Sequence, residues 1–199
     1  MKKRTYILLY NQNTRGIVTT AGGPYLAVAL VSIRMLRRTG SKLPVEVFLA
    51  SKEEFDPQIC GHILPSLNAR CIVLQGIFDL STSKTNFKID KYQYKVISIL
   101  FSTFEDVLFL DSDYFPIFDP DQLFDAEPFL SIGIVLWPDF WFPSESPSFF
   151  EATEIPAPPI YVRALTESRE ILYSKSKHNL SIILAIYYNY YSPDFYYPL

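Results

Sequence analysis

The 199-residue sequence has little glycine, few cysteines and histidines, and no long hydrophobic run. Seven glycines exclude collagen-like and glycine-rich linker architectures. No run of about 18 apolar residues is present, so we expect no membrane span in this chain. The basic start at Met1–Arg4 resembles a signal-peptide n-region, but the apolar stretch over 6–10 is too short for one.

Cysteine and histidine are each present only twice, and neither cysteine has metal-ligand spacing, which disfavours a zinc site. Cys60 and Cys71 are close in sequence. They would form one disulfide in an oxidising compartment, or remain two buried thiols in a reducing one. The spacing leaves both alternatives open.

Apolar residues are abundant instead, at 49% hydrophobic and 16% aromatic, which excludes intrinsic disorder. The length favours a single domain over 1–199, with residues 1–14 as an irregular N-terminal extension. The last residues, Tyr196–Leu199, supply no helix or strand that closes the fold. We therefore expect an incomplete domain that is truncated at its C-terminus.

The charges are divided unevenly between the two halves. Residues 1–104 hold 14 Lys and Arg against 6 Asp and Glu, whereas residues 105–199 hold 4 against 15. From Glu105 to Pro159 there are 12 acids and no cation. A site for a divalent cation and a phosphorylated ligand fits this division, and a solvated acidic face fits it equally well. No basic stripe interleaved with aromatics is present, so nucleic acid is not expected as a partner.

Strand and helix patterns alternate along the first 110 residues and predict an α/β fold, with a mostly parallel sheet flanked by helices. After Leu110 the pattern weakens, and we expect an irregular C-terminal part with loops over 81–86 and 142–159. The predicted strands are 16–20, 45–50, 71–74, 106–110 and 132–136, and the predicted helices are 24–38, 52–67, 91–103 and 179–190.

Asp111 and Asp113 form the sharpest candidate site, because they directly follow the apolar strand 106–110. Ligands bind beyond the carboxyl ends of strands in open α/β sheets, and carboxylate oxygens suit Mn²⁺ or Mg²⁺. A diphosphate substrate would complete the coordination. A haloacid-dehalogenase phosphatase or an EF-hand is disfavoured by Phe115 and Pro116. A turn or capping pair of aspartates is the structural alternative.

Three further groups are candidate contacts of a nucleotide sugar. Gly22 and Gly23, between a strand and a helix, would let a phosphate approach the backbone, although such a pair is often only a turn. Lys95, on the helix before the Asp pair, could reach a phosphate or be solvated. Trp137 and Asp139 combine an aromatic face with a carboxylate, as sugar sites do, or form a core residue and a turn.

Together these segments resemble the fungal alpha-1,2-mannosyltransferases that add branches to mannan, glycosyltransferase family 71. The resemblance implies a GT-A fold, a GDP-mannose donor, Mn²⁺ (or Mg²⁺), a mannose-containing glycan acceptor and retention at the anomeric carbon. It also implies a Golgi enzyme held by an N-terminal membrane helix. The segments that carry it are 15–23, 41–48, 92–95, 101–105, 110–113, 136–141 and 187–189.

The sequence departs from the family pattern at three places. These 199 residues are expected to lack the membrane anchor and the C-terminal segment of the family. A segment similar to Glu-Ser-Gly-Gln in the family reads Glu167–Glu170 here, with Arg169 in place of Gly. If the backbone there needs positive φ, Arg169 resists it and slows transfer. Alternatively, Arg169 turns to solvent or pairs with Glu167 or Glu170 and does no harm. The alternative function is a non-catalytic remnant, and no catalytic residue beyond the metal pair is predicted.

Overall fold

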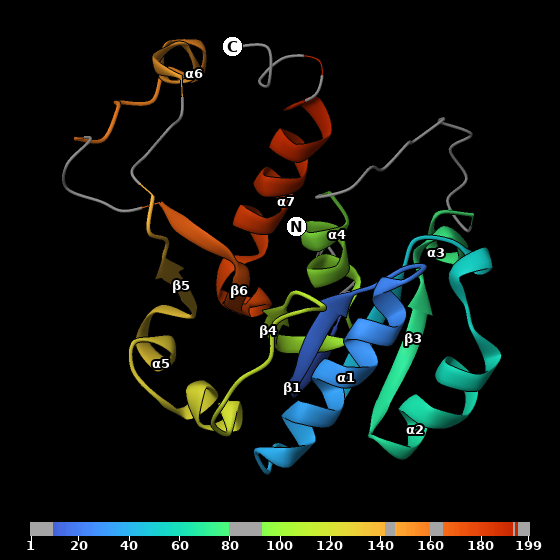
Figure 1. The fold of residues 1–199 in the computed structure, drawn as a ribbon. Coiled ribbons are helices and arrows are strands. Elements are labelled where there is room, and N and C mark those ends of the chain that lie inside the picture. Colours follow the sequence, from blue (N-terminus) through green and yellow to red (C-terminus); the bar gives the residue numbers. More distant parts are fainter. Residues whose placement is uncertain (1–9, 80–92, 142–145, 160–164, 193, 195–199) are drawn as a thin grey trace, which may run out of the picture.

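A computed structural model describes residues 10–79, 93–141, 146–159, 165–192 and 194. It contains a six-stranded sheet with the order β3-β2-β1-β4-β6-β5 (Figure 1). Strands β1 to β4 are parallel neighbours, whereas β6 runs antiparallel to β4 and to β5. The strands are β1 (Asn11–Thr20), β2 (Val45–Leu49), β3 (Ala69–Val73), β4 (Phe104–Leu110), β5 (Ile134–Pro138) and β6 (Thr166–Ser174).

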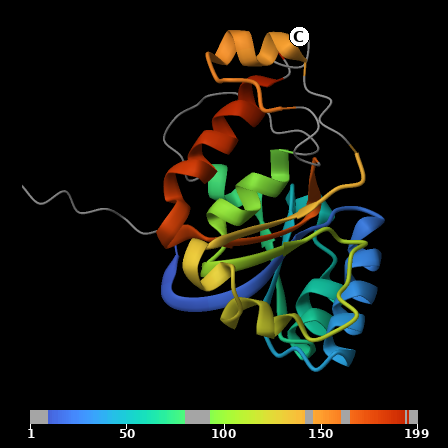
Figure 2. The same cartoon turned by 90° about the vertical axis from the view of Figure 1, so that its left-hand side faces the viewer.

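Helices cover both faces of this sheet, as the prediction of an α/β layered fold required (Figure 2). One core cluster joins α1 and α2 to the sheet, and a second joins α4 and α7 to its other face. The α-helices are α1 (Tyr25–Arg38), α2 (Leu64–Ser66), α3 (Leu74–Asp79), α4 (Gln93–Phe101), α5 (Phe129–Ile132), α6 (Pro147–Thr153) and α7 (Lys175–Tyr191). Short 3-10 turns η1 (Lys52–Glu54) and η3 (Pro120–Asp125) and a π-helical turn η2 (Ile59–Ile63) complete the set.

The helix predicted over 24–38 is confirmed as α1. Its buried side chains include Leu26, Ile33 and Leu36, which recur at helical spacing. Pro24 precedes the first turn, and Gly40 follows the end with φ +101°, a left-handed conformation that glycine adopts without strain.

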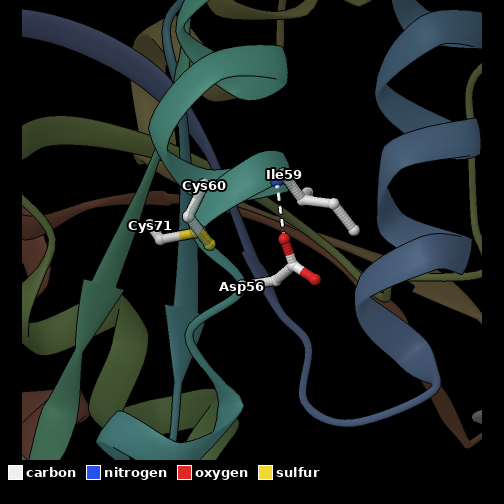
Figure 3. The surroundings of a disulfide bond; sticks show 4 residues. All are labelled: Asp56, Ile59, Cys60 and Cys71. Carbon is white, nitrogen blue, oxygen red and sulfur yellow. Dashed lines mark hydrogen bonds between the residues drawn. A yellow bond between two sulfur atoms is a disulfide. The ribbon is translucent and has the colours of Figure 1, made fainter.

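The helix predicted over 52–67 is interrupted at Phe55 and Asp56: η1 precedes this gap, and a helical run that includes η2 and α2 follows it. The interruption lies directly before Pro57, because a residue before proline is biased away from the helical region. The Asp56 carboxylate accepts a hydrogen bond from the Ile59 N–H at 2.9 Å and so starts the second segment (Figure 3). A continuous helix therefore does not form.

A disulfide joins Cys60 on η2 to Cys71 on β3, which settles the alternative left open by the sequence (Figure 3). The bridge ties the edge strand of the sheet to the helical segment that covers it. Its partners are 11 residues apart. The cross-link limits the unfolded chain more than it limits the folded one.

The C-terminal part is more regular than predicted. Strand β6 was missed, and α6 falls within the predicted loop 142–159. The strand predicted at 132–136 begins at Ile134, because Gly133 has φ +82° and ends α5. Helix α7 begins at Lys175, four residues before the predicted start, with a non-helical backbone at His178.

The start of the first strand also differs from the prediction. Strand β1 begins at Asn11, inside the predicted irregular extension 1–14, because the Asn11 N–H donates to the Thr103 carbonyl oxygen at 2.8 Å. The register shifts between Asn11 and Arg15, so this part of the strand is bulged. Residues 1–9 and the predicted loop 81–86 lie outside the described residues.

In the part that is described, no helix combines the length and apolar character needed to cross a bilayer.

Candidate active site

The carboxyl ends of β1, β2 and β4 meet at one edge of the sheet, where a cavity of about 620 Å³ opens. This volume lies in the range of small-molecule sites. The cavity lies at the edge where open α/β sheets bind their ligands. Its lining residues are Thr20, Ala21, Gly22, Tyr25, Phe48, Ala50, Glu54, Tyr94, Lys95, Asp111, Ser112, Asp113, Ser168 and Arg169.

Asp111 and Asp113 both line this cavity, directly after the end of β4. The Asp111 N–H donates to the Arg169 carbonyl oxygen on β6 at 2.9 Å, and the Tyr114 N–H donates to the Asp111 carbonyl oxygen at 3.0 Å. On the α1 side, the Ser32 hydroxyl donates to the Ser112 carbonyl oxygen at 2.6 Å. The turn that carries both carboxylates is therefore held by β6 and by α1.

Lys95 reaches Asp111 from α4. Its Nζ lies 3.1 Å from Oδ1 and 3.3 Å from Oδ2 of Asp111. The same Nζ donates to the Ser168 carbonyl oxygen at 2.6 Å and lies 5.1 Å from the centre of the Phe109 ring. The side chains of Lys95 and Asp111 are 14% and 28% exposed, so this ion pair is largely shielded from water.

The pKa of the Asp111 carboxyl is raised, chiefly because burial disfavours its charged form. Lys95 opposes the rise, and the neighbouring charge of Asp113 adds to it. A second cation at this turn would further favour ionised Asp111, because opposite charges nearby stabilise the carboxylate.

The donor atoms of this pair suit a hard divalent cation, since both are carboxylates. Among the described residues, no group of three or more His, Cys, Asp or Glu side chains is arranged to hold a metal. Asp111 and Asp113 alone would leave most coordination positions to phosphate oxygens and water, which is how Mg²⁺ is commonly held in phosphate-transfer sites. The residues therefore fit a metal that binds together with a diphosphate.

Gly22 lines the cavity and Gly23 is not among the lining residues. A Cβ on Gly22 would lie 2.4 Å from Oε1 of Glu54, so a side chain there would displace that carboxylate. Glu54 is held in turn by the Ala50 N–H, which donates to its Oε2 at 2.7 Å. Gly23 has φ +53° and allows the chain to turn into α1.

Trp137 and Asp139 are also absent from the cavity lining. Trp137 is partly buried and packs against the core cluster on the α1 face. The Asp139 N–H donates to the Leu165 carbonyl oxygen at 2.6 Å, and its carboxylate accepts from the Phe140 N–H at 2.6 Å. Beyond them, Phe140 and Trp141 are strongly exposed.

Sequence reasoning missed Glu54 and Ser168 as cavity residues. Glu54 follows the carboxyl end of β2, so the rule that pointed to Asp111 could have found it. Ser168 lies on β6, where alternating polar and apolar residues were not interpreted as a strand.

Arg169 also lines the cavity, and the positive φ considered for this position does not occur. It is not among the non-glycine residues with positive φ. It lies within strand β6, where its carbonyl oxygen accepts from Asp111. Its Nε lies 3.8 Å from Oε1 of Glu167.

A family model described as a mannosyltransferase matches residues 14–164. The chain belongs to this mannosyltransferase family. It is 36% identical over 233 residues to alpha-1,2-mannosyltransferase MNN21 of Candida albicans (strain SC5314), covering 96% of this chain and 35% of that protein. It is 32% identical over 218 residues to alpha-1,2-mannosyltransferase MNN2 of Saccharomyces cerevisiae (strain S288c), covering 92% and 36%. The chain thus spans about a third of the length of these curated relatives.

Two solved glycosyltransferases of the GT-A type have a similar fold, which confirms the predicted fold. The glycosyltransferase GlyE of Streptococcus pneumoniae TIGR4 has a TM-score of 0.55 at 16% identity, over 92% of this chain and 40% of that one. The galactosyltransferase LgtC, solved with donor and acceptor sugar analogs, has a TM-score of 0.56 at 16% identity, over 85% and 61%.

Proposed function

We propose that this chain carries the donor site of an alpha-1,2-mannosyltransferase, which transfers mannose from GDP-mannose to a mannose-containing glycan with retention at the anomeric carbon. The observation that carries the proposal is the carboxylate pair Asp111 and Asp113 at the rim of a nucleotide-sized cavity. Family membership supports mannosyl transfer, and the alpha-1,2-mannosyltransferase relatives support the linkage.

Four residues of the cavity have a definite task in this proposal. Asp111 and Asp113 would hold Mn²⁺ or Mg²⁺, which neutralises the charge that develops on the departing diphosphate. Lys95, which is paired with Asp111 in the structure, would supply a positive charge to the same diphosphate. Gly22 leaves the backbone bare where the nucleotide approaches, since any side chain would collide with Glu54.

For the acceptor we propose the segment after β5. Strand β5 runs parallel to β4, because each is antiparallel to β6, and so both end at the cavity edge. Phe140 and Trp141 follow there and are 102% and 73% exposed. Aromatic faces of this kind can pack against a sugar ring, and Asp139 and Trp137 stand beside them in the chain.

We also propose that the protein works in the lumen of the Golgi. The Cys60–Cys71 disulfide supports this location, because such bridges form and persist in oxidising compartments.

The test is mannose transfer by the purified chain from GDP-mannose to an oligomannose acceptor, with and without Mn²⁺. We expect Mn²⁺-dependent release of GDP and a new alpha-1,2 linkage by NMR. UDP-galactose serves as the control donor and should give no product. Binding of GDP-mannose without any transfer or hydrolysis would instead support the alternative that the chain is non-catalytic.

A further inference from the structure

The Lys95 ammonium forms an ion pair with the carboxylate that the proposed metal would also bind. Its Nζ contacts both Asp111 oxygens, at 3.1 and 3.3 Å. A Mn²⁺ or Mg²⁺ ion would bind to oxygen atoms of the same carboxylate, because these ions prefer oxygen ligands. Two cations would therefore share one carboxylate that is only 28% exposed.

We propose that Lys95 is a built-in counter-ion that competes with the divalent cation for Asp111, so that tight metal binding depends on a nucleoside diphosphate. This inference rests on the proposed function, because it assumes that the cavity takes a metal and a diphosphate. It adds that the two ligands depend on each other: the metal and the nucleotide each bind weakly alone and tightly together.

Contacts with other residues keep the Lys95 ammonium from moving into solvent. The Ser168 carbonyl oxygen accepts from it at 2.6 Å, and the Phe109 ring lies 5.1 Å beneath it. Its side chain is 14% exposed. A metal that arrives alone thus meets a fixed positive charge in a site where water screens charges weakly.

A diphosphate removes this conflict because it brings negative charge for both cations. Lys95 can turn from Asp111 to a phosphate oxygen and keep its bond to Ser168. The Asp111 carboxylate would then be free to hold the metal. Linkage requires that the nucleotide tightens metal binding by the same factor as the metal tightens nucleotide binding.

The experiment measures Mn²⁺ affinity by electron paramagnetic resonance, with and without saturating GDP. For the unaltered chain we expect GDP to tighten Mn²⁺ binding at least about tenfold, within the usual range of coupling. Lys95→Gln keeps a donor for Ser168 but lacks the charge. It should bind Mn²⁺ alone about tenfold more tightly and lose most of the GDP effect.

Two matched variants separate charge from other effects. Lys95→Arg keeps a cation and should retain weak binding of Mn²⁺ alone. Lys42→Gln removes an exposed lysine that precedes β2, at the opposite edge of the sheet, and should behave as the unaltered chain.

Equal affinity of Lys95→Gln and the unaltered chain for Mn²⁺ alone would overturn the counter-ion role, while Mn²⁺ binding with GDP would leave the proposed function standing. Absence of Mn²⁺ binding even with GDP would overturn both. If Lys95→Gln does not fold by circular dichroism, the unaltered chain decides: Mn²⁺ affinity that is independent of GDP rejects the inference.

Discussion

The two edges of the central sheet both hold charged side chains that are shielded from water, and they use them differently. At the amino edge, the Glu46 carboxylate accepts three hydrogen bonds, from the Arg70 guanidinium at 2.5 Å and from the hydroxyl and N–H of Thr103 at 2.6 and 3.0 Å. Nearby, the buried Lys175 Nζ donates to the Ser102 and Leu100 carbonyl oxygens at 2.6 and 3.3 Å. Protein groups satisfy these charges.

At the carboxyl edge, Asp111 and Lys95 pair with each other and still face a cavity of about 620 Å³. The comparison shows that a buried charge is not by itself a sign of a binding site. Glu46 is more deeply buried than Asp111, and Arg70 and Thr103 already donate three hydrogen bonds to its carboxylate. Asp111 retains capacity for one, because it borders open space.

The largest effect should come from the cavity edge. Asp111→Asn and Asp113→Asn each remove a charged metal ligand while nearly preserving shape. Metal-dependent binding of GDP-mannose and turnover should each fall about a thousandfold. Isothermal titration calorimetry with and without Mn²⁺ measures the binding, and circular dichroism checks that the fold persists. Unchanged Mn²⁺ dependence in either variant would remove that residue from the site.

At the amino edge a comparable change should cost stability and leave donor binding intact. Glu46→Ala leaves Arg70 and Thr103 without their acceptor, which should lower the free energy of unfolding by about 3 kcal/mol. Urea denaturation measures this change. Glu151→Ala on α6 is the control, because that side chain is exposed and should change stability by less than about 0.5 kcal/mol. Similar losses for both variants would contradict the structural role of Glu46.

Lys175, the second buried charge at the amino edge, should make the free energy of unfolding depend on pH. Burial lowers the pKa of Lys175 to about 7, against a partial opposing effect of Glu46. The unfolded chain holds this proton up to about pH 10. Between these values the unfolded state binds more protons, so stability rises with pH.

Relative to Lys175→Met, the unaltered chain should therefore gain about 2 kcal/mol between pH 7 and pH 9. Urea denaturation of both proteins at the two pH values isolates this contribution, because the other titrating groups cancel in the difference. A constant difference between them would show that Lys175 keeps its ordinary pKa.

The smallest effect is expected from Arg169, which lines the cavity but is mostly exposed, at 61% for its side chain. Its backbone lies in a strand without positive φ, so glycine relieves no strain there. Arg169→Gly should destabilise the fold by less than about 1 kcal/mol. With Glu170→Gln added, turnover should change less than about tenfold. A larger rise, measured as mannose transfer, would mean that the guanidinium obstructs the cavity.

Local sequence patterns were enough to predict the parallel strands of the sheet and the Asp111 and Asp113 pair. The strands were predicted from runs of β-branched residues, and α1 was predicted from the helical spacing of Leu26, Ile33 and Leu36. Both signals come from residues that are close together in the sequence. The same applies to Asp111 and Asp113, since a carboxylate pair directly after an apolar strand lies at a predictable sheet edge. Lys95 was suspected because its helix directly precedes that strand.

Contacts between distant segments decided the rest. Strand β6 gains its identity from antiparallel pairing with β4, about 60 residues earlier, and it brings Ser168 to Lys95. The disulfide required Cys60 and Cys71 to meet across η2 and β3, which spacing alone left open. Only the folded chain brings together the groups that surround a buried charge, because desolvation and pairing act through space. The sequence therefore did not reveal that the Glu46 carboxylate is fully hydrogen-bonded while the Asp111 carboxylate faces a cavity.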